Sequence, residues 1–485
     1  MTFDTIIRGG TIATASDTFS CDIGITAGRI AALGNDLGNA NDIVDATGML
    51  VLPGGIDSHV HIAQPSGPDV VMADDFASAT RSAAFGGNTT VLPFAMQQKG
   101  QSLREVVRDY HKKAEGQCYI DVSFHLIIAD ATDAVLGQEL PALVHDGYTS
   151  FKVFMTYEGL ALSDMEMLNV MSVARDTGAL VMIHAENYDA IRFLTDRLER
   201  AGHTAPHHHA TSRPIPVARE ATHRAISLAE LIDVPIVIVH VSNGAAMEEI
   251  RRAQSRGLKV YGETCPQYLV LTEKHLEGLN MEGAKYVCSP PPRDEASQRD
   301  CWSGLQQGVF ALFSSDHCPF RYDDPKGKLV PKGRTSFRWV PNGIPGIETR
   351  LPILFSEGVV KGRISLNEFV ALTATNHAKT YGLYPRKGTI AVGADADIAI
   401  WDPNRQVTIS QSLMHGGSDY TPYEGIAVTG WPVSTMLRGR FVVRDGTLVG
   451  ALGGGAYVTR EKSALATPVG KKNGPAAVSG QGREA

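Results

Sequence analysis

The sequence predicts an α/β protein: a (β/α)8 TIM-type barrel with a second, smaller β-sandwich domain built from both chain ends. From residue 49 onward, short apolar runs alternate with amphipathic segments, in eight successive units. Strands that are apolar almost throughout and alternate with helices indicate a parallel sheet covered on both faces. Eight such units are typical of a closed barrel. A doubly wound open sheet is the competing architecture for the same alternation.

The predicted strands of the barrel are rich in β-branched and aromatic residues. They cover residues 49–61, 89–96, 119–129, 148–155, 179–186, 235–242, 258–266 and 309–319. Helical patterns lie between them, for example DDFASATRSAAFGG, SLREVVRDYHKKAEG and SNGAAMEEIRRAQSRG. In several of these segments Ser, Thr or Asp stands where the helix begins and Gly where it ends, as is usual for helix caps.

Both ends of the chain differ from this central part. Short β-rich stretches broken by glycine turns, such as TIIRGGTIAT near the start and GADADIAIWDP near the end, have a similar character. We therefore expect the two ends to pair in one small sandwich. The predicted division is 1–53 and 386–458 for the two parts of the β-sandwich, 54–385 for the barrel, and 459–485 for a flexible tail. The tail consists of small and polar residues and is either disordered or draped over a neighbour.

The composition is typical of a globular protein, with 43% apolar and 20% charged residues. The net charge of −7 and the lack of a Lys/Arg-rich block argue against a nucleic-acid partner. The apolar runs are shorter than the roughly 20 residues of a membrane helix, and we expect neither a membrane partner nor a signal peptide. Six scattered cysteines without C-x-x-C spacing indicate reduced thiols and a cytoplasmic location.

Histidines at the ends of predicted strands form the main candidate site. His59 and His61, in GGIDSHVHI, are two residues apart, so in a strand both face the same side. Imidazole is a common zinc ligand, and side chains at the carboxyl ends of barrel strands converge on one pocket. The other candidates at such ends are Lys152, His184, His240 and Asp316. A single histidine there is more often a core residue, but its recurrence in successive units favours a metal site.

Lys152 stands out because FKVFMTY surrounds it with apolar and aromatic residues. An unpaired buried charge is costly. One interpretation is a lysine whose amine extends to the barrel mouth. The alternative is a lysine that has reacted with CO2, because a carbamate would supply an anionic bridge between two divalent ions held by four imidazoles and one carboxylate.

Characteristic motifs follow one another between about residues 3 and 450, among them PGGIDSHVHI, FKVFMTYEG, VMIHAEN, IVIVHVSNG, CSPPPR, FSSDHCPF and PNGIPGIETRLP. Together they resemble the cyclic amidohydrolases of the amidohydrolase superfamily, most closely the dihydropyrimidinase/hydantoinase branch. The resemblance implies a homotetramer with two Zn²⁺ ions per chain, bridged by carboxylated Lys152 (N6-carboxylysine) and a hydroxide. It assigns His59, His61 and Asp316 to one ion, His184 and His240 to the other, and the carbamate to both.

The same resemblance implies that the enzyme opens the cyclic amide bond of 5,6-dihydropyrimidines and 5-substituted hydantoins, giving N-carbamoyl amino acids. The bridging hydroxide would attack the ring carbonyl. Tyr157 would donate a hydrogen bond to the developing oxyanion, and Asp316 would pass the hydroxide proton to the leaving nitrogen. Backbone groups of Ser289 and Asn342 would bind the imide or ureide edge of the ring. His317, beside Asp316, is either support or packing.

Dihydroorotase and allantoinase are alternatives within this class. Dihydroorotases usually carry an arginine for the substrate carboxylate where this chain has Ala63, so a neutral ring is favoured here, whereas allantoinase stays open. A non-catalytic scaffold is the alternative of another class, but all six ligand positions are filled. Glu158 stands where relatives often have lysine, which leaves the preferred 5-substituent open.

Two further segments carry predictions. The run HHH at 207–209 lies in a region rich in Ala, Thr and Pro, and we interpret it as solvated. The segment SDYTPYEG, residues 418–425, together with the β-sandwich, offers aromatic surface that a monomer would leave wet. We therefore expect it to support the oligomer.

Overall fold

A sheet of parallel strands wound into a barrel forms the centre of the computed structural model, which describes residues 2–67 and 69–470. The sheet has nine strands. Two of them, β10 and β11, both pair with β9 and together occupy one place in the barrel, so the barrel has eight places for strands. The strands are β8 (Gly55–Val60), β9 (Asn88–Met96), β10 (Asp121–Val122), β11 (His125–Ile127), β12 (Ser150–Phe154), β13 (Leu180–His184), β14 (Ile236–Ile238), β15 (Val260–Thr264) and β16 (Phe310–Phe313). After β16 the chain returns to the first strand, where His317 pairs with Val60. The predicted barrel is confirmed.

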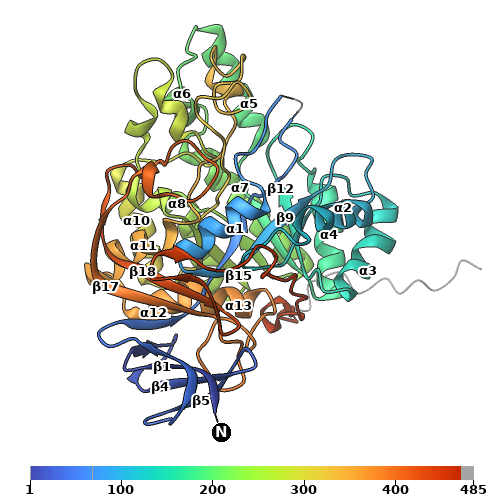
Figure 1. Ribbon diagram of the computed structural model, residues 1–485. Coiled ribbons are helices and arrows are strands. Elements are labelled where there is room, and N and C mark those ends of the chain that lie inside the picture. Colours follow the sequence, from blue (N-terminus) through green and yellow to red (C-terminus); the bar gives the residue numbers. More distant parts are fainter. Residues whose placement is uncertain (1, 68, 471–485) are drawn as a thin grey trace, which may run out of the picture.

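Helices follow the strands and surround the barrel, with α2, α3 and α4 on one side of the view in Figure 1. The longer ones are α1 (Phe76–Phe85), α2 (Leu103–Ala114), α4 (Asp164–Thr177), α5 (Tyr188–Arg200), α7 (Ile215–Ile232), α8 (Gly244–Ser255) and α10 (Glu295–Gln306). The shorter ones are α3 (Leu140–His145), α6 (His208–Thr211), α9 (Gln267–Val270), α11 (Arg350–Leu354), α12 (Leu366–Val370) and α13 (Asn376–Thr380). The cap signals read from the sequence act as expected in α4, which begins with a capping box between Ser163 and Glu166 and ends at the left-handed Gly178. None of the described helices combines the length and hydropathy of a membrane-spanning segment.

Two further sheets contain the β-strands of the chain ends. The larger one has the order β20 (Thr447–Leu448), β19 (Arg440–Arg444), β18 (Ala427–Leu437), β17 (Ile398–Thr408), β7 (Leu50–Pro53), β2 (Thr11–Ala13) and β3 (Thr18–Ser20). The smaller one has the order β5 (Arg29–Gly34), β4 (Asp22–Thr26), β1 (Phe3–Arg8) and β6 (Ala40–Asp45). In Figure 1 the smaller sheet lies beneath β17 and β18. Strands from both ends thus share one sheet, as predicted.

A common apolar core joins these two sheets. Ile7 and Ile23 from the smaller sheet pack in one buried cluster with Ile398 and Met436 from the larger sheet. Such burial of the inner faces is the usual source of cohesion in a sandwich. The domain limits at 53, 385 and 458 stay predictions.

The first predicted strand, residues 49–61, is in fact two strands that belong to different sheets. β7 pairs with β17 of the sandwich, whereas β8 pairs with β9 of the barrel. Gly54 separates them, and a Cβ atom there would lie 2.2 Å from a methyl group of Thr89. The chain passes from one sheet to the other at a point where only glycine fits. The sequence does not reveal this passage, because the apolar run continues across it without a polar residue.

Part of the predicted flexible tail packs against the barrel. Arg460 is buried and donates a hydrogen bond of 2.7 Å to Ser150 Oγ. Farther along, Lys259 Nζ donates to Thr467 O, and the backbone of Val469 and Gly470 donates to Asp233. Polar contacts therefore fix residues 459–470 without the apolar pattern that a sequence would reveal. The rest of the predicted tail, 471–485, lies outside the described residues.

The segment 418–425 does not present the aromatic surface expected of it. Tyr420 is 6% exposed and Tyr423 is 0% exposed within a single chain. Tyr423 packs with Leu271, Ile353 and Trp431 in a core cluster between the barrel and the larger terminal sheet. The prediction of a wet aromatic face was wrong, because these rings are used inside the chain.

Candidate metal centre

All six predicted ligands line one cavity of about 580 Å³ at the carboxyl ends of the barrel strands. His59 lies in β8, Lys152 in β12 and His184 at the end of β13. His61, His240 and Asp316 follow β8, β14 and β16 by one to three residues. A cavity of this size suits a small organic substrate. The sequence-based grouping of these residues therefore matches their positions in space.

His59, His61 and Asp316 form the tightest group, with one ligand atom from each within 4.8 Å of the others. Asp316 Oδ1 lies 3.2 Å from His59 Nε2 and 3.5 Å from His61 Nε2. Burial raises the pKa of Asp316, but the neighbouring imidazoles outweigh it, and the pKa falls below its usual value. Two imidazole nitrogens and an ionised carboxylate that face one point are a donor set that fits a divalent transition metal.

Hydrogen bonds on the far side of the two rings hold them in the orientation a metal ligand needs. His59 Nδ1 bonds Glu263 Oε1 at 2.6 Å, and His61 Nδ1 bonds Gln64 Oε1 at 2.7 Å. Each oxygen accepts a hydrogen bond from Nδ1–H, so Nε2 carries the free lone pair on the side of the ring near Asp316. Burial also lowers the pKa of His59 well below its usual value, so the ring stays neutral.

Lys152 is 1% exposed and its Nζ lies 3.3 Å from His59 Nε2. It forms no ion pair within the described ranges, and the rings of Phe94 and Phe154 lie 5.4 and 5.3 Å from the amine. Burial lowers the pKa of Lys152 to about 8. A substantial fraction of the amine is therefore neutral near pH 7.5, and only the neutral amine can react with CO2.

His184 and His240 lie next to the tight group, with their ring centroids 4.3 Å apart. His184 Nε2 bonds Glu186 Oε2 at 2.8 Å, which leaves Nδ1. His240 Nδ1 is buried without a hydrogen-bond partner among the described residues. Burial lowers the pKa of both rings, so both are neutral. An orphaned buried nitrogen and two neutral imidazoles fit a second metal position.

Unusual backbone geometry marks several of these residues. His240, Asp316 and Tyr157 have φ values of 40°, 50° and 74°, in the left-handed region that residues other than glycine rarely adopt. Such strain is concentrated at functional sites, where surrounding contacts hold it in place. The side chains are thereby directed into the cavity.

Tyr157, Ser289 and Asn342 also line the cavity, as predicted. Burial and the nearby Glu186 carboxylate raise the pKa of Tyr157, whereas side-chain hydrogen bonds to Ser289 and Asn342 oppose that rise. The phenol therefore keeps its proton and lies beside both residues. The oxyanion role of Tyr157 and the binding of the ring by backbone groups of Ser289 and Asn342 stay predictions.

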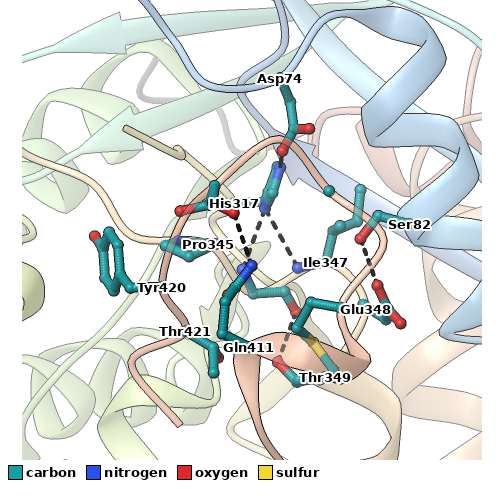
Figure 2. A pocket seen from close by; sticks show the side chains of 14 residues that line it. Asp74, Ser82, His317, Pro345, Ile347, Glu348, Thr349, Gln411, Tyr420 and Thr421 are labelled. Atoms are coloured by element: carbon teal, nitrogen blue, oxygen red, sulfur yellow. Dashed lines mark hydrogen bonds and ion pairs between the residues drawn. The ribbon is translucent and has the colours of Figure 1, made fainter. Parts of the chain in front are cut away.

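His317 has no free ring nitrogen. Figure 2 shows its ring between Asp74 and the loop that follows Pro345. Nε2 bonds Asp74 Oδ2 at 3.0 Å, and Nδ1 accepts from the backbone N–H groups of Gly346 and Ile347 at 3.1 and 3.4 Å. His317 thus supports the loops around the site, and it lines a separate small pocket rather than the cavity of the six candidate ligands.

The run HHH is not uniformly solvated, because His209 is 1% exposed. Its Nε2 donates to Cys288 O at 2.8 Å, and Arg213 donates to its Nδ1 at 3.1 Å. The sequence interpretation was wrong for this residue, since the short helix α6 turns His209 inward while His207 stays exposed. His209 supports the turn that carries Ser289 and is not a metal ligand.

Three carboxylate or amide groups next to the ligands were missed by sequence reasoning: Gln64, Glu186 and Glu263. Glu186 had a local signal, because it is two residues from His184. Glu263 had none, since its contact with His59 joins residues 204 positions apart.

Comparisons with known proteins agree with the expected resemblance. The Amidohydrolase family model matches residues 50–442. The chain is 48% identical to a D-hydantoinase from Geobacillus stearothermophilus, over 94% of this chain and 96% of that protein. It is 46% identical to a D-hydantoinase from Rhizobium radiobacter, over 95% and 99%. The crystal structure of dihydropyrimidinase from Brevibacillus agri NCHU1002 superposes with a TM-score of 0.92 at 46% identity, covering 95% of this chain and 99% of that one.

Proposed function

Since this chain belongs to the amidohydrolase family, we propose that it opens the ring of 5,6-dihydropyrimidines, such as dihydrouracil and dihydrothymine, and of 5-substituted hydantoins. The products are N-carbamoyl amino acids. The observation that carries this proposal is the convergence of His59, His61 and Asp316 beside the buried Lys152 in one substrate-sized cavity.

Two zinc ions per chain are the proposed cofactors, with Lys152 carboxylated between them. His59, His61 and Asp316 would hold one ion, and His184 and His240 the other. When bound, such ions lower the pKa of a water molecule and polarise a carbonyl oxygen. The neutral imidazoles and the partly neutral, ion-pair-free Lys152 support this assignment.

The protein's own groups would move the protons and orient the ring. Asp316, ionised in its buried position, accepts a proton on a carboxylate oxygen and returns it to the ring nitrogen when the amide C–N bond breaks. The Tyr157 hydroxyl, which keeps its proton, donates a hydrogen bond to the carbonyl oxygen as negative charge develops there. Backbone groups of Ser289 and Asn342 hold the opposite edge of the ring.

The cavity favours a neutral ring over an anionic one. Its lining, within the described residues, contains no arginine, and Ala63 offers no charge. Lys99 and Glu158 lie exposed at the mouth and have opposite charges. A substrate carboxylate would therefore find no buried cationic partner that is not committed to metal binding.

The decisive experiment is a kinetic panel on the zinc-loaded enzyme, with dihydrouracil, dihydrothymine, hydantoin, 5-phenylhydantoin, allantoin and dihydroorotate. We expect turnover of the neutral dihydropyrimidines and hydantoins together with about two zinc ions per chain. Preference for allantoin or dihydroorotate would overturn the substrate class. A protein that takes up no zinc and hydrolyses none of these rings would indicate a scaffold.

We also propose a cytoplasmic homotetramer. All six cysteines are free thiols, which agrees with a reducing compartment. The family resemblance supports the oligomer, whereas the aromatic residues of segment 418–425 do not, because they are buried within the chain. Sedimentation of the zinc-loaded protein at micromolar concentration tests it, and a single 52.1 kDa species would refute it.

A further inference from the structure

Lys328 is a buried lysine for which neither the metal centre nor the proposed reaction has a use. It is 0% exposed, and its Nζ donates hydrogen bonds to two backbone oxygens, Val287 O at 2.6 Å and Pro341 O at 2.7 Å. It forms no ion pair in the described part of the chain. An amine buried away from any carboxylate is costly, so its two carbonyl contacts need an explanation.

Both carbonyls belong to turns that line the cavity. We call residues 287–290 the serine turn, since they carry Ser289, and residues 340–343 the asparagine turn, since they carry Asn342. The two turns also meet directly, because Gly343 N donates to Val287 O at 3.0 Å. Val287 O therefore accepts from Lys328 and from the asparagine turn at once, and Lys328 bridges the two turns on the side away from the cavity.

The surroundings of the amine are apolar. Val287, Leu329 and Val340 are members of one buried cluster, and the ring of Phe320 lies 5.8 Å from Nζ. Burial lowers the pKa of Lys328 to about 7, although the Cys288 and Cys318 thiols oppose this shift. A neutral amine still has two N–H groups, one for each carbonyl, so the bridge persists in either charge state.

We propose that Lys328 is a positioning residue of the substrate site, which fixes the separation of the serine turn and the asparagine turn and thereby sets the affinity for the substrate ring. The inference rests on the proposed function for the role of the two turns. Mutation cannot replace the backbone groups of the two turns, but it can replace the side chain that holds them. A substitution of Lys328 therefore tests the role of the turns without changing a residue that contacts a metal ligand.

The test is Lys328→Met, which keeps most of the side-chain volume and removes both hydrogen bonds. We expect KM for dihydrouracil or hydantoin to rise by about 10- to 100-fold, as hydrogen bonds of a charged or strongly polar group are lost. The kcat value should change by less than about threefold, and the zinc content should equal that of the parent, because the metal ligands do not contact Lys328. Lys328→Gln, which keeps an amide donor, should give an intermediate KM.

Lys259→Met is the matched control. Lys259 Nζ also donates to a backbone oxygen, Thr467 O at 2.7 Å, but Lys259 directly precedes β15 and does not line the cavity. This variant should keep the parent KM and kcat. A folded, zinc-loaded Lys328→Met variant with the parent KM would overturn the proposal, as would an equal rise in KM for Lys259→Met.

Hydrogen–deuterium exchange gives a readout that needs no substrate. In Lys328→Met, the amides of residues 285–289, 339–340 and 342–344 should exchange faster than in the parent, while the strands of the barrel keep their protection. If that variant does not fold, the same measurement on Lys328→Gln decides, and parent-like exchange in both turns would refute the bridge. If instead the parent hydrolyses no cyclic ureide, the proposed function fails, but exchange still reports whether Lys328 holds the turns.

Discussion

Glu263→Gln is the change that most directly tests how the first metal position is built. The Glu263 side chain is 0% exposed and accepts three hydrogen bonds: from His59 Nδ1 at 2.6 Å, from Ser314 Oγ at 2.8 Å and from the backbone N–H of His240 at 3.2 Å. Glutamine keeps the shape, and its oxygen can still face His59 while its amide group faces Ser314. The change therefore removes the negative charge behind the ring and little else.

The expected loss follows from that single difference. Hydrogen bonds to an ionised partner are roughly twice as strong as neutral ones, and removal of a carboxylate that orients a metal-binding histidine typically costs about 10- to 100-fold in metal affinity. This corresponds to about 1.4–2.8 kcal/mol. Burial raises the pKa of Glu263 to about 7 in the metal-free protein. The metal-free variant should therefore be no less stable than the parent at pH 8, where the parent must keep this carboxylate charged and buried.

Competition with a chromophoric zinc chelator measures the affinity, and thermal unfolding of the metal-free form measures stability. Glu249→Gln is the matched control. Glu249 accepts a hydrogen bond of 3.0 Å from His223 Nδ1, and the His223 side chain is exposed at the surface. That control should leave zinc affinity unchanged. If Glu263→Gln bound zinc as tightly as the parent, the orientation of His59 would not depend on this charge, and the reasoning would be wrong.

Three other changes have defined outcomes. Asp316→Asn should keep the fold and some metal but lower turnover of dihydrouracil by at least about 10²-fold, because an amide cannot accept the proton; turnover near the parent rate, measured with metal content, would require another acceptor. Lys152→Ala should lose binuclear metal binding, with partial rescue by short carboxylic acids, and in a crystal of the parent a free ammonium with two bound metals would exclude the carbamate. Burial lowers the pKa of His377 to about 3. Below about pH 6.5 the unfolded chain therefore binds a proton at this residue that the folded chain does not bind. The free energy of unfolding then falls by up to about 1.4 kcal/mol per pH unit as the pH decreases. His377→Gln should weaken that fall in urea titrations at pH 4–7, and an unchanged slope would contradict it.

The sequence was sufficient to bring the six candidate ligands together in one cavity, because the signals of these residues are local. His59 and His61 share a side through the two-residue period of a strand, and each other ligand ends an apolar run. These rules place a side chain relative to its own strand, and the barrel then brings the strand ends together. No knowledge of contacts between distant segments is needed for that step.

The groups that support the ligands depend on contacts that no local pattern encodes. Glu263 looks like an ordinary polar residue at the end of VYGETCP, and its partner His59 is 204 positions away. Lys328, in a stretch rich in Lys, Gly and Pro, looks like a solvated loop residue although it is fully buried. His209 was misread for the same reason. The composition of a segment predicts the average exposure of its residues. Whether one particular side chain is buried depends on the part of the protein that packs against it.

His317 shows how geometry decides what adjacency in the sequence leaves open. Its position beside Asp316 makes it the obvious substitute as a proton acceptor. However, Nδ1 already accepts from the backbone N–H groups of Gly346 and Ile347, so the ring proton resides on Nε2, where Asp74 binds it. To take a proton from the reaction, the ring would have to give up the bonds to the 346–347 backbone, and the loop that follows Asn342 would lose its anchor. Residual turnover in Asp316→Asn would therefore have to use a group other than the His317 ring, and His317→Asn should act through the shape of the loop, with a change in KM.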